Sequence, residues 1–444
     1  MNGLQKEYAE SFAKLIKIPT VTGSDRQNFA DFRKVLAQEF PEVYNVCDVI
    51  LPGGAESDAL MFKWKGRSDE YPLVLMAHQD VVPAVGGDWK YDPFGGVIAE
   101  GKIWGRGSMD CKSTLFCIMQ SVNELIAEKV VPEQDVYLCF SDSEETSGPG
   151  AEHCRDWLTA HGVKPAVAVD EGGAIVEKAF PGMTKPFAMV GIIEKGYCDL
   201  KFIARSKGGH SSSPPSDTPL ARLAAFVHYC ETHRLFKRRM SQPARDMLKG
   251  LSDGLSGALK TVTKHVDFFA PLITKVLPAL TPFGGALLGT TMTFTMAQGA
   301  AAPNVIPQEA YVVANLRFAP GDTADECIAK VRSIADRFGL ETEVLISREH
   351  SPVVDVDSEG YVYFEQTLRK VFPDIGVAPY LIFGGTDCRT MQEITPCALR
   401  CTPCRLSAEQ LAAMHASNEN VDVSAVAEGV VFFKEYIKGY KGAK

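Results

Sequence analysis

The feature that most constrains the fold is an alternation of short apolar segments with helical segments in the first half of the chain. Strand-like runs at 71–78, 135–145 and 165–173 each end in a histidine or in acidic residues, and segments with helical periodicity at 113–128 and 151–162 separate them. Strands that alternate with helices predict an α/β domain with a largely parallel sheet. The polar ends should then meet at the carboxyl edge of that sheet, where open α/β sheets bind ligands.

The pattern changes near residue 194. The next elements follow the order β-α-β-β-α-β, which is typical of a ferredoxin-like domain. Their ranges are 197–205, 218–233, 291–299, 310–318, 323–339 and 342–347. The stretch 234–290 is too long for a simple connection and predicts a helical insertion. After Pro352 the α/β pattern resumes, so we expect one domain at 1–192 and 350–444 and an α+β domain inserted at 193–349.

The composition excludes several classes of partner. The 444 residues carry a formal net charge of -9, whereas nucleic acid requires a basic surface, so no nucleic acid partner is expected. No run of roughly 18 or more apolar residues occurs, so no membrane partner is expected. The stretch 268–289 is broken by Lys275 and three prolines, and we expect it to be buried or to pack as part of a lid. The 12 cysteines lack the spacing of a disulfide framework, which indicates a cytoplasmic protein.

His78 and Asp80 close the first strand-like run. Histidine is a common ligand of transition metals, and an Asp two residues further along an extended chain points to the same side and could orient the ring. A strand-end histidine beside an unrelated turn residue is an equally open interpretation. Asp110 lies in a Gly-rich turn before a helix. Its two oxygens could bridge two cations, although an Asp at such a place is more commonly a helix N-cap.

Three further polar groups follow later elements. Glu144 and Glu145 are adjacent carboxylates, so one can bind a metal while the other acts as a general base, although such a run is often only a solvated loop. Asp170 ends a strand, and His415 lies in a polar loop before the last helix. Together the two histidines and three carboxylates provide about the set that two zinc ions need when they share a bridging carboxylate. No cysteine belongs to this set, which is typical of a catalytic rather than a structural site.

Ten short motifs carry a resemblance to a known family over nearly the whole chain. They are AHQDVVP (77–83), WKYDPFGG (89–96), GRGSMDCKS (105–113), SEETSGPGA (143–151), VDEGG (169–173), GGHSSSPP (208–215), PNVIP (303–307), RFAP (317–320), GGTDCR (384–389) and HASNE (415–419). The set resembles the acetylornithine deacetylase, succinyl-diaminopimelate desuccinylase, aminoacylase and carboxypeptidase S family of di-zinc metallopeptidases. AHQDVVP and the long 234–290 segment look most like the carboxypeptidase S or dipeptidase branch. The resemblance implies a phosphorylase/hydrolase-like catalytic domain with an inserted lid or dimerisation domain.

The resemblance also implies a metal site and a base. His78 and Asp170 would bind one zinc ion, Glu145 and His415 the other, and Asp110 would bridge them. Each subunit would hold two Zn²⁺, for which Co²⁺ or Mn²⁺ could substitute. Asp80 would orient His78, Glu144 would take a proton from water, and the Asp110–Cys111 peptide would be cis.

Four more residues match substrate positions of the family. His210 resembles a histidine that reaches into the active site of the partner subunit and stabilises the oxyanion, so the resemblance implies a homodimer. Asn304 and Arg317 match positions that contact the substrate carboxylate, and Gly385 belongs to a loop that lines the same pocket. An arginine suits this role because its planar guanidinium can grip both carboxylate oxygens.

The predicted function is hydrolysis of an amide bond in small peptides, of the carboxypeptidase or dipeptidase type. An N-acyl-amino-acid amidohydrolase of the aminoacylase or deacetylase type is the first alternative. A non-catalytic binding protein on the same fold is a remote alternative, because all five ligands and the base are present.

Overall fold

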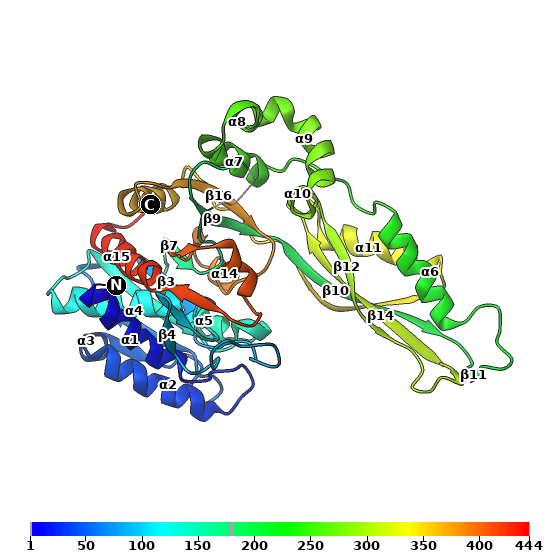
Figure 1. Ribbon diagram of the computed structural model, residues 1–444, viewed down its shortest axis with the longest axis horizontal. Helices are drawn as coiled ribbons and strands as arrows, with labels where there is room; N and C mark the ends of the chain where they lie inside the picture. The colour runs from blue at the N-terminus through cyan, green and yellow to red at the C-terminus, as the bar shows by residue number, and fades with distance from the viewer. Residues whose placement is uncertain (1, 178–181, 444) are drawn as a thin grey trace.

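The computed structural model describes residues 2–177 and 182–443, which form two lobes (Figure 1). The larger lobe is built on a ten-stranded sheet in the order β1-β2-β6-β3-β7-β17-β9-β8-β18, with β16 paired to β9. The strands are β1 (Asp48–Ile50), β2 (Leu60–Trp64), β3 (Ser68–His78), β6 (Gln134–Ser141), β7 (Val167–Asp170), β8 (Ile175–Val176), β9 (Phe187–Glu194), β16 (Gly376–Ile382), β17 (Cys397–Arg400) and β18 (Arg405–Leu406).

The centre of this sheet is parallel. β3 pairs in parallel with β6 and β7, and β7 pairs in parallel with β17. The strand segment Pro72–His78 is buried throughout, as expected for a parallel strand covered on both faces. This parallel pairing brings the carboxyl ends of β3, β6 and β7 to one edge, where the sequence predicted that the polar residues meet.

Helices cover both faces of the large sheet. The largest apolar core joins the sheet to α1 (Gly3–Ile16), α2 (Arg26–Glu39), α3 (Pro41–Val46), α4 (Lys112–Ala127), α12 (Glu359–Val371) and α15 (Val423–Gly439). A smaller core on the other face includes side chains of α5 (Gly150–Ala160) and α13 (Cys388–Met391). A three-stranded sheet of β4 (Val97–Ala99), β5 (Lys102–Trp104) and β19 (Asn420–Asp422) completes the lobe, next to α14 (Ala408–Ala413).

The second lobe contains a four-stranded antiparallel sheet in the order β12-β14-β10-β15. Its strands are β10 (Gly196–Arg205), β12 (Thr291–Gln298), β14 (Glu309–Phe318) and β15 (Glu341–Arg348), and its helices are α6 (Pro219–Thr232) and α11 (Ala324–Asp336). With these helices between the strands, the chain order is that of a ferredoxin-like domain, so the predicted fold class is confirmed. A two-stranded ribbon of β11 (Gly209–His210) and β13 (Val305–Ile306) extends the far end of this lobe (Figure 1).

The segment between α6 and β12 is helical, as predicted. It contains α7 (Gln242–Leu251), α8 (Gly257–Lys264), α9 (Val266–Leu280) and α10 (Pro282–Leu288), with a short 3-10 turn at Ser252–Gly254. The segment 268–289 was expected to be buried or to pack as part of a lid. Burial does not hold for one face of α9, because Phe268 is 81% exposed and Leu280 is 71% exposed, and packing as a lid stays a prediction. Among the described residues, no helix is both long enough and apolar enough to cross a bilayer.

Candidate metal centre and active site

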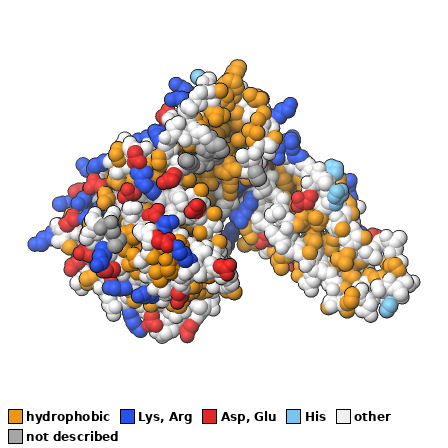
Figure 2. Space-filling model, viewed as in Figure 1, with side chains coloured by type: hydrophobic (Ala, Val, Ile, Leu, Met, Phe, Trp, Pro, Cys, Tyr) orange, Lys and Arg blue, Asp and Glu red, His pale blue; other side chains and the backbone are white. Residues whose placement is uncertain are grey.

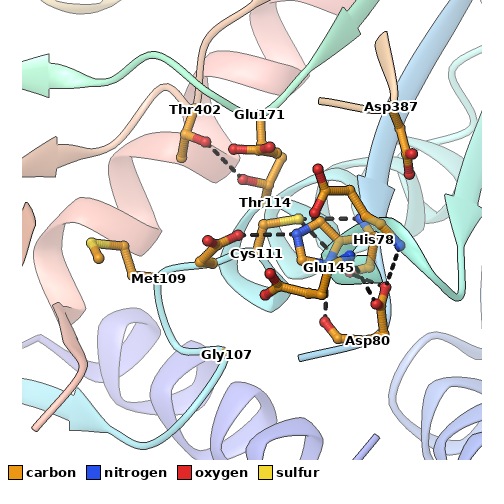
Figure 3. A network of polar contacts seen from close by, with 12 residues as sticks. His78, Asp80, Gly107, Met109, Cys111, Thr114, Glu145, Glu171, Asp387 and Thr402 are labelled. Carbon is orange, nitrogen blue, oxygen red and sulfur yellow. Dashed lines mark hydrogen bonds and ion pairs between the residues drawn. The ribbon is translucent and has the colours of Figure 1, made fainter. Parts of the chain in front are cut away.

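The site begins at the carboxyl end of β3. The His78 ring is buried, and its Nδ1 lies 2.9 Å from the carbonyl oxygen of Asp80 and 3.5 Å from Asp80 Oδ1. Asp80 Oδ1 and Oδ2 also accept the backbone N–H groups of Glu144 and Glu145, at 3.2 and 3.1 Å. Asp80 therefore orients the histidine and the loop that carries the glutamate pair, and Figure 3 shows the three groups together.

Asp110 lies between the two histidines. Its Oδ1 is 3.0 Å from His78 Nε2, and its Oδ2 is 3.0 Å from His415 Nε2. His415 Nε2 is also 3.2 Å from Glu145 Oε2. The two Asp110 oxygens thus face two different imidazoles, which is the arrangement a bridging carboxylate requires. The Asp110–Cys111 peptide is cis, as the family resemblance implied.

Two clusters of side chains that could hold a metal ion arise among the described residues. One joins His78, Asp110 and Cys111, and the other joins Asp110, Glu145 and His415; within each, the donor atoms lie within 4.8 Å of one another. Cys111 was not a predicted ligand. Its Sγ accepts the backbone N–H of His78 at 3.1 Å, and burial raises the pKa of the thiol well above its ordinary value, so it stays protonated at neutral pH.

Asp170 belongs to neither cluster, although it ends β7 beside β3 and is buried. Its Oδ1 accepts the backbone N–H of Glu171 at 2.9 Å. Its Oδ2 is buried without a hydrogen-bond partner among the described residues, and the same holds for Oε1 of Glu145. Buried carboxylate oxygens without a partner are costly, and a cation is the group that stabilises them best.

Several carboxylates lie close together at this edge of the sheet, and their pKa values are raised. Burial, followed by repulsion from Asp170, raises the pKa of Asp387 to about 7. Burial raises the pKa of Asp170 to about 6, and it raises the pKa of Glu144 well above its ordinary value. Imidazole and carboxylate donors are the set that zinc binds in catalytic sites. The residues at this edge of the sheet therefore fit a pair of divalent metal ions.

Glu419 is a functional candidate that the sequence reasoning did not single out. It is buried, and its Oε2 accepts Arg106 Nη1 at 2.7 Å and the Gly107 N–H at 3.1 Å. Its Oε1 accepts the N–H groups of Met109 and Asp110 at 2.8 and 3.1 Å. One carboxylate thus fixes the whole turn that presents Asp110. Its place in HASNE, four residues after His415, was the available signal.

Glycine is required within that turn. Gly107 adopts a φ of +81°, and a Cβ added there would lie 2.6 Å from Val81 Cγ1. Both the backbone conformation and the close approach of Val81 exclude a larger residue. The Gly-rich turn is therefore shaped to hold Asp110 rather than to cap a helix.

An apolar cavity of about 220 Å³ opens beside Asp110 and Glu171. Its apolar wall comes from Met109, Ala174, Val176, Met189, Phe283, Tyr380, Leu406, Leu411 and Met414. Phe283 belongs to α10 of the helical insertion, and Tyr380 belongs to β16. A group attached to a carbonyl carbon near Asp110 would find an apolar environment in this cavity.

Arg317 lies at the base of the inserted lobe, close to the large sheet. Its Nη1 donates to the carbonyl oxygen of Phe383 at 3.4 Å, and its guanidinium lies 4.5 Å from the ring centroid of Tyr197. Gly385 follows two residues after Phe383, in the loop whose Thr386 hydroxyl donates to Glu194 at 2.7 Å. Arg317 and the Gly385 loop are therefore neighbours, as the predicted pocket requires.

His210 and Asn304 lie elsewhere. Both are exposed on the β11–β13 ribbon, at the end of the inserted lobe that is remote from β3 and β7 (Figure 1). The carbonyl oxygen of Asn304 accepts the N–H of Ser211 at 3.0 Å, so the two residues occupy one small unit. Within a single chain this unit joins neither the candidate metal site nor Arg317.

Comparisons with known proteins agree with this geometry. The model of Peptidase family M20/M25/M40 matches residues 74–439. The N-fatty-acyl-amino acid synthase/hydrolase PM20D1 of Homo sapiens is 31% identical over 437 residues, which cover 97% of this chain and 87% of the relative. The probable carboxypeptidase S-like 2 of Dictyostelium discoideum is 29% identical over 449 residues, with 97% and 85% covered.

Solved structures share the fold. An M20 family metallo-carboxypeptidase, Sso-CP2 from Sulfolobus solfataricus, superposes with a TM-score of 0.70 at 15% identity and covers 99% of both chains. The di-peptidase Dug1p from Saccharomyces cerevisiae gives a TM-score of 0.69 at 15% identity, with 98% of this chain and 96% of that chain covered. The chain therefore belongs to peptidase family M20/M25/M40, and it is a metal-dependent hydrolase that acts on amide bonds.

Proposed function

We propose that the protein is a zinc-dependent peptidase of the carboxypeptidase or dipeptidase type, with Glu144 as its general base. The observation that carries the proposal is Asp110, whose two oxygens face His78 and His415 beside a glutamate pair. The zinc ligands would be His78, Asp110, Glu145, Asp170 and His415. When bound, the two ions would lower the pKa of a water molecule and polarise the scissile carbonyl group.

The protein residues supply the proton transfers. Glu144 takes a proton from the attacking water at its carboxylate, and burial helps because the raised pKa makes this carboxylate a better base. The same carboxyl group then donates the proton to the nitrogen of the leaving amine. Asp80 holds both the His78 ring and the backbone of Glu144 in place during these steps.

Substrate recognition would involve two subunits. Arg317, next to the Gly385 loop, would bind the free carboxylate of the substrate. His210 would donate a hydrogen bond to the developing oxyanion of the partner's substrate. Asn304 shares the ribbon with His210, so the partner would supply both residues together. The active unit in this proposal is a homodimer.

A second candidate substrate is an N-acyl amino acid with an apolar acyl group. The apolar cavity beside Asp110 favours it, because such a cavity suits a hydrocarbon chain better than a polar peptide. The PM20D1 relatives, named N-fatty-acyl-amino acid synthase/hydrolases, support the same substrate class. A panel of dipeptides and of N-acyl amino acids with acyl chains of increasing length, each with a free or amidated carboxylate, separates the two candidates.

The role of Glu144 is tested by Glu144→Gln, with Glu152→Gln on the exposed side of α5 as the matched control. Turnover should fall by about 100-fold or more while the bound zinc per chain stays unchanged. The control should keep both turnover and zinc. Turnover retained in Glu144→Gln would contradict the assignment of the base, and loss of zinc would make Glu144 a ligand instead.

A further inference from the structure

Helix α9 presents an apolar stripe to solvent. The exposed apolar residues Phe268, Leu272, Val276 and Leu280 are spaced four residues apart, so they lie along one side of the helix. Leu259 of the neighbouring α8 is 53% exposed and adds to the same region. Figure 2 shows hydrophobic side chains gathered over α9 at the apex of the molecule.

The stripe is fixed in this orientation by the opposite side of the helix. Val266, Ala270 and Ile273 are buried in the largest core, and Leu277 packs against that core. α9 also contacts α7 and α10, so the helix is held within the fold. The exposed side is therefore a face that the fold of this chain leaves uncovered.

The charge around the stripe is opposite to that of the rest of the protein. Residues 234–290 contain nine Lys and Arg and three Asp and Glu, a net charge of +6, in a chain whose formal net charge is -9. Lys260, Lys264 and Lys275 are exposed, and none of them forms an ion pair with a residue in the described ranges. Asp267, the acidic residue in the first turn of α9, is paired with Arg245 and Lys249.

We propose that the α8–α9 face docks on the surface of an anionic lipid bilayer. A helix with exposed apolar residues on one side and lysines beside them lies in the interface of a membrane, because the apolar side enters the acyl boundary while the lysines meet anionic headgroups. Docking of this kind needs no helix that spans the bilayer. It differs from the sequence-based expectation of no membrane partner, which rested on the absence of a spanning segment.

The insertion also reaches the cavity of the active site. α10 follows α9 directly, and its Phe283 lines the apolar cavity beside Asp110. Phe283 packs against Phe383 with ring centroids 5.2 Å apart. Docking through α9 would therefore place the lining of the apolar cavity within the same helical unit that contacts the lipid. The docking itself does not depend on which amide the enzyme cleaves.

Vesicle binding tests the proposal with the 444-residue chain. In a sedimentation assay, the wild type should pellet with vesicles of phosphatidylcholine and phosphatidylglycerol. It should stay in the supernatant with vesicles of pure phosphatidylcholine or at high salt. Leu272→Asp should reduce the bound fraction at least about tenfold. The matched control is Leu4→Asp, because Leu4 is also a helical leucine and both are 52% exposed.

The contribution of charge is tested by substituting Lys260, Lys264 and Lys275 with Glu. Each substitution should lower the affinity for anionic vesicles about fivefold.

Several outcomes would overturn the proposal. One is that the wild type does not bind anionic vesicles. Another is that Leu4→Asp and Leu272→Asp lose the same fraction of vesicle binding. A dimer that dissociates in Leu272→Asp, seen by sedimentation velocity without lipid, would assign the face to a second copy of the chain instead. Circular dichroism and hydrolysis of a water-soluble substrate serve as folding controls for each variant, and they separate a failure of docking from a failure of the proposed catalytic function.

Discussion

Glu419 accepts hydrogen bonds from Arg106, Gly107, Met109 and Asp110, and it is the residue that holds the Asp110 turn in shape. Glu419→Gln keeps the size of the side chain but replaces one acceptor oxygen with a donor and breaks a buried ion pair. We expect the unfolding free energy to fall by about 3 kcal/mol and zinc affinity to fall by about 10- to 100-fold. Chemical denaturation and competition with a zinc chelator measure the two effects.

Glu409→Gln, on the exposed side of α14, is the control for this change. It should leave both quantities as in the wild type. If Glu419→Gln binds zinc as tightly as the wild type, the turn holds Asp110 without help from Glu419.

Lys195 gives the protein a pH-dependent stability. Its Nζ donates to the carbonyl oxygens of Ala286 and Gly289 at 2.9 and 2.7 Å, and burial, followed by repulsion from Arg317, lowers its pKa to about 8. Between this value and the ordinary 10.5, the unfolded chain binds more protons than the folded one, so stability from this group rises with pH.

We therefore expect the stability of the wild type relative to Lys195→Met to increase by about 2 kcal/mol between pH 7 and pH 10. Urea unfolding at several pH values measures the difference. Lys330→Met, on an exposed position of α11, should show no such slope relative to the wild type. A difference that is independent of pH would mean that Lys195 does not change its protonation in this range.

The candidate residues could be found from the sequence because they follow strands whose order fixes their place. His78 and Asp170 end parallel neighbours, so their proximity follows from the pairing of β3 with β7. Glu419 could not be found in this way. Its role arises from a contact with Gly107 across 312 residues of sequence, and its place in HASNE was the only nearby signal. The roles of the candidates in metal binding and catalysis stay predictions.

At the scale of secondary-structure elements, one arginine contacts both of the chain segments that connect the two lobes. Arg389 Nη2 donates to the carbonyl oxygen of Lys195 at 2.7 Å, and its Nη1 donates to that of Glu349. Its Nε donates to Glu194 at 3.1 Å, and Glu194 in turn accepts Arg400 Nε at 2.8 Å. This arginine therefore ties the end of β9 to the segment after β15, and it does so from α13, which follows the loop that carries Gly385.

We expect Arg389→Lys to loosen the two lobes, because one ammonium group cannot reach three acceptors that a planar guanidinium reaches together. The unfolding free energy should fall by about 2 kcal/mol. The value of kcat/KM should fall about tenfold, because Arg317 would no longer be held at a fixed distance from the candidate metal site. Thermal unfolding and small-angle scattering measure stability and lobe mobility. Arg369→Lys, at an exposed ion pair on α12, is the control and should change neither.

Elements with a strong apolar pattern were predictable, and those that depend on distant partners were not. The parallel strands and the β-α-β-β-α-β order are confirmed. β4 and β5 are three residues each and pair with each other, and β5 also pairs with β19, which lies more than 300 residues later in the chain. The exposed side of α9 was also missed, because an apolar segment does not reveal which of its sides the fold leaves uncovered.

At the scale of the whole molecule, the position of His210 predicts complementation between subunits. His210 lies at the far end of the inserted lobe, so in a dimer it would serve the partner's site (Figure 1). His210→Ala and Glu144→Gln should each abolish turnover alone. After unfolding together and refolding, the mixture should recover roughly a quarter of wild-type activity, since half of the dimers are mixed and each has one intact site.

Refolding each variant alone is the control and should yield no activity. Absence of recovery in a mixture that forms mixed dimers would mean that His210 does not act on the partner's site. No property of a single chain predicts how two copies meet, and this is the part of the site that neither the sequence nor one subunit defines.

The opposite charges of the insertion and the rest of the chain have a consequence for how the molecule moves. With +6 on residues 234–290 and therefore -15 on the remainder, the helical insertion that includes α8 and α9 is the positive part of a negatively charged protein. Near a negatively charged surface the protein would rotate so that this part leads, before any atom makes contact. Ionic strength should therefore change the rate of arrival at such a surface more than the rate of departure.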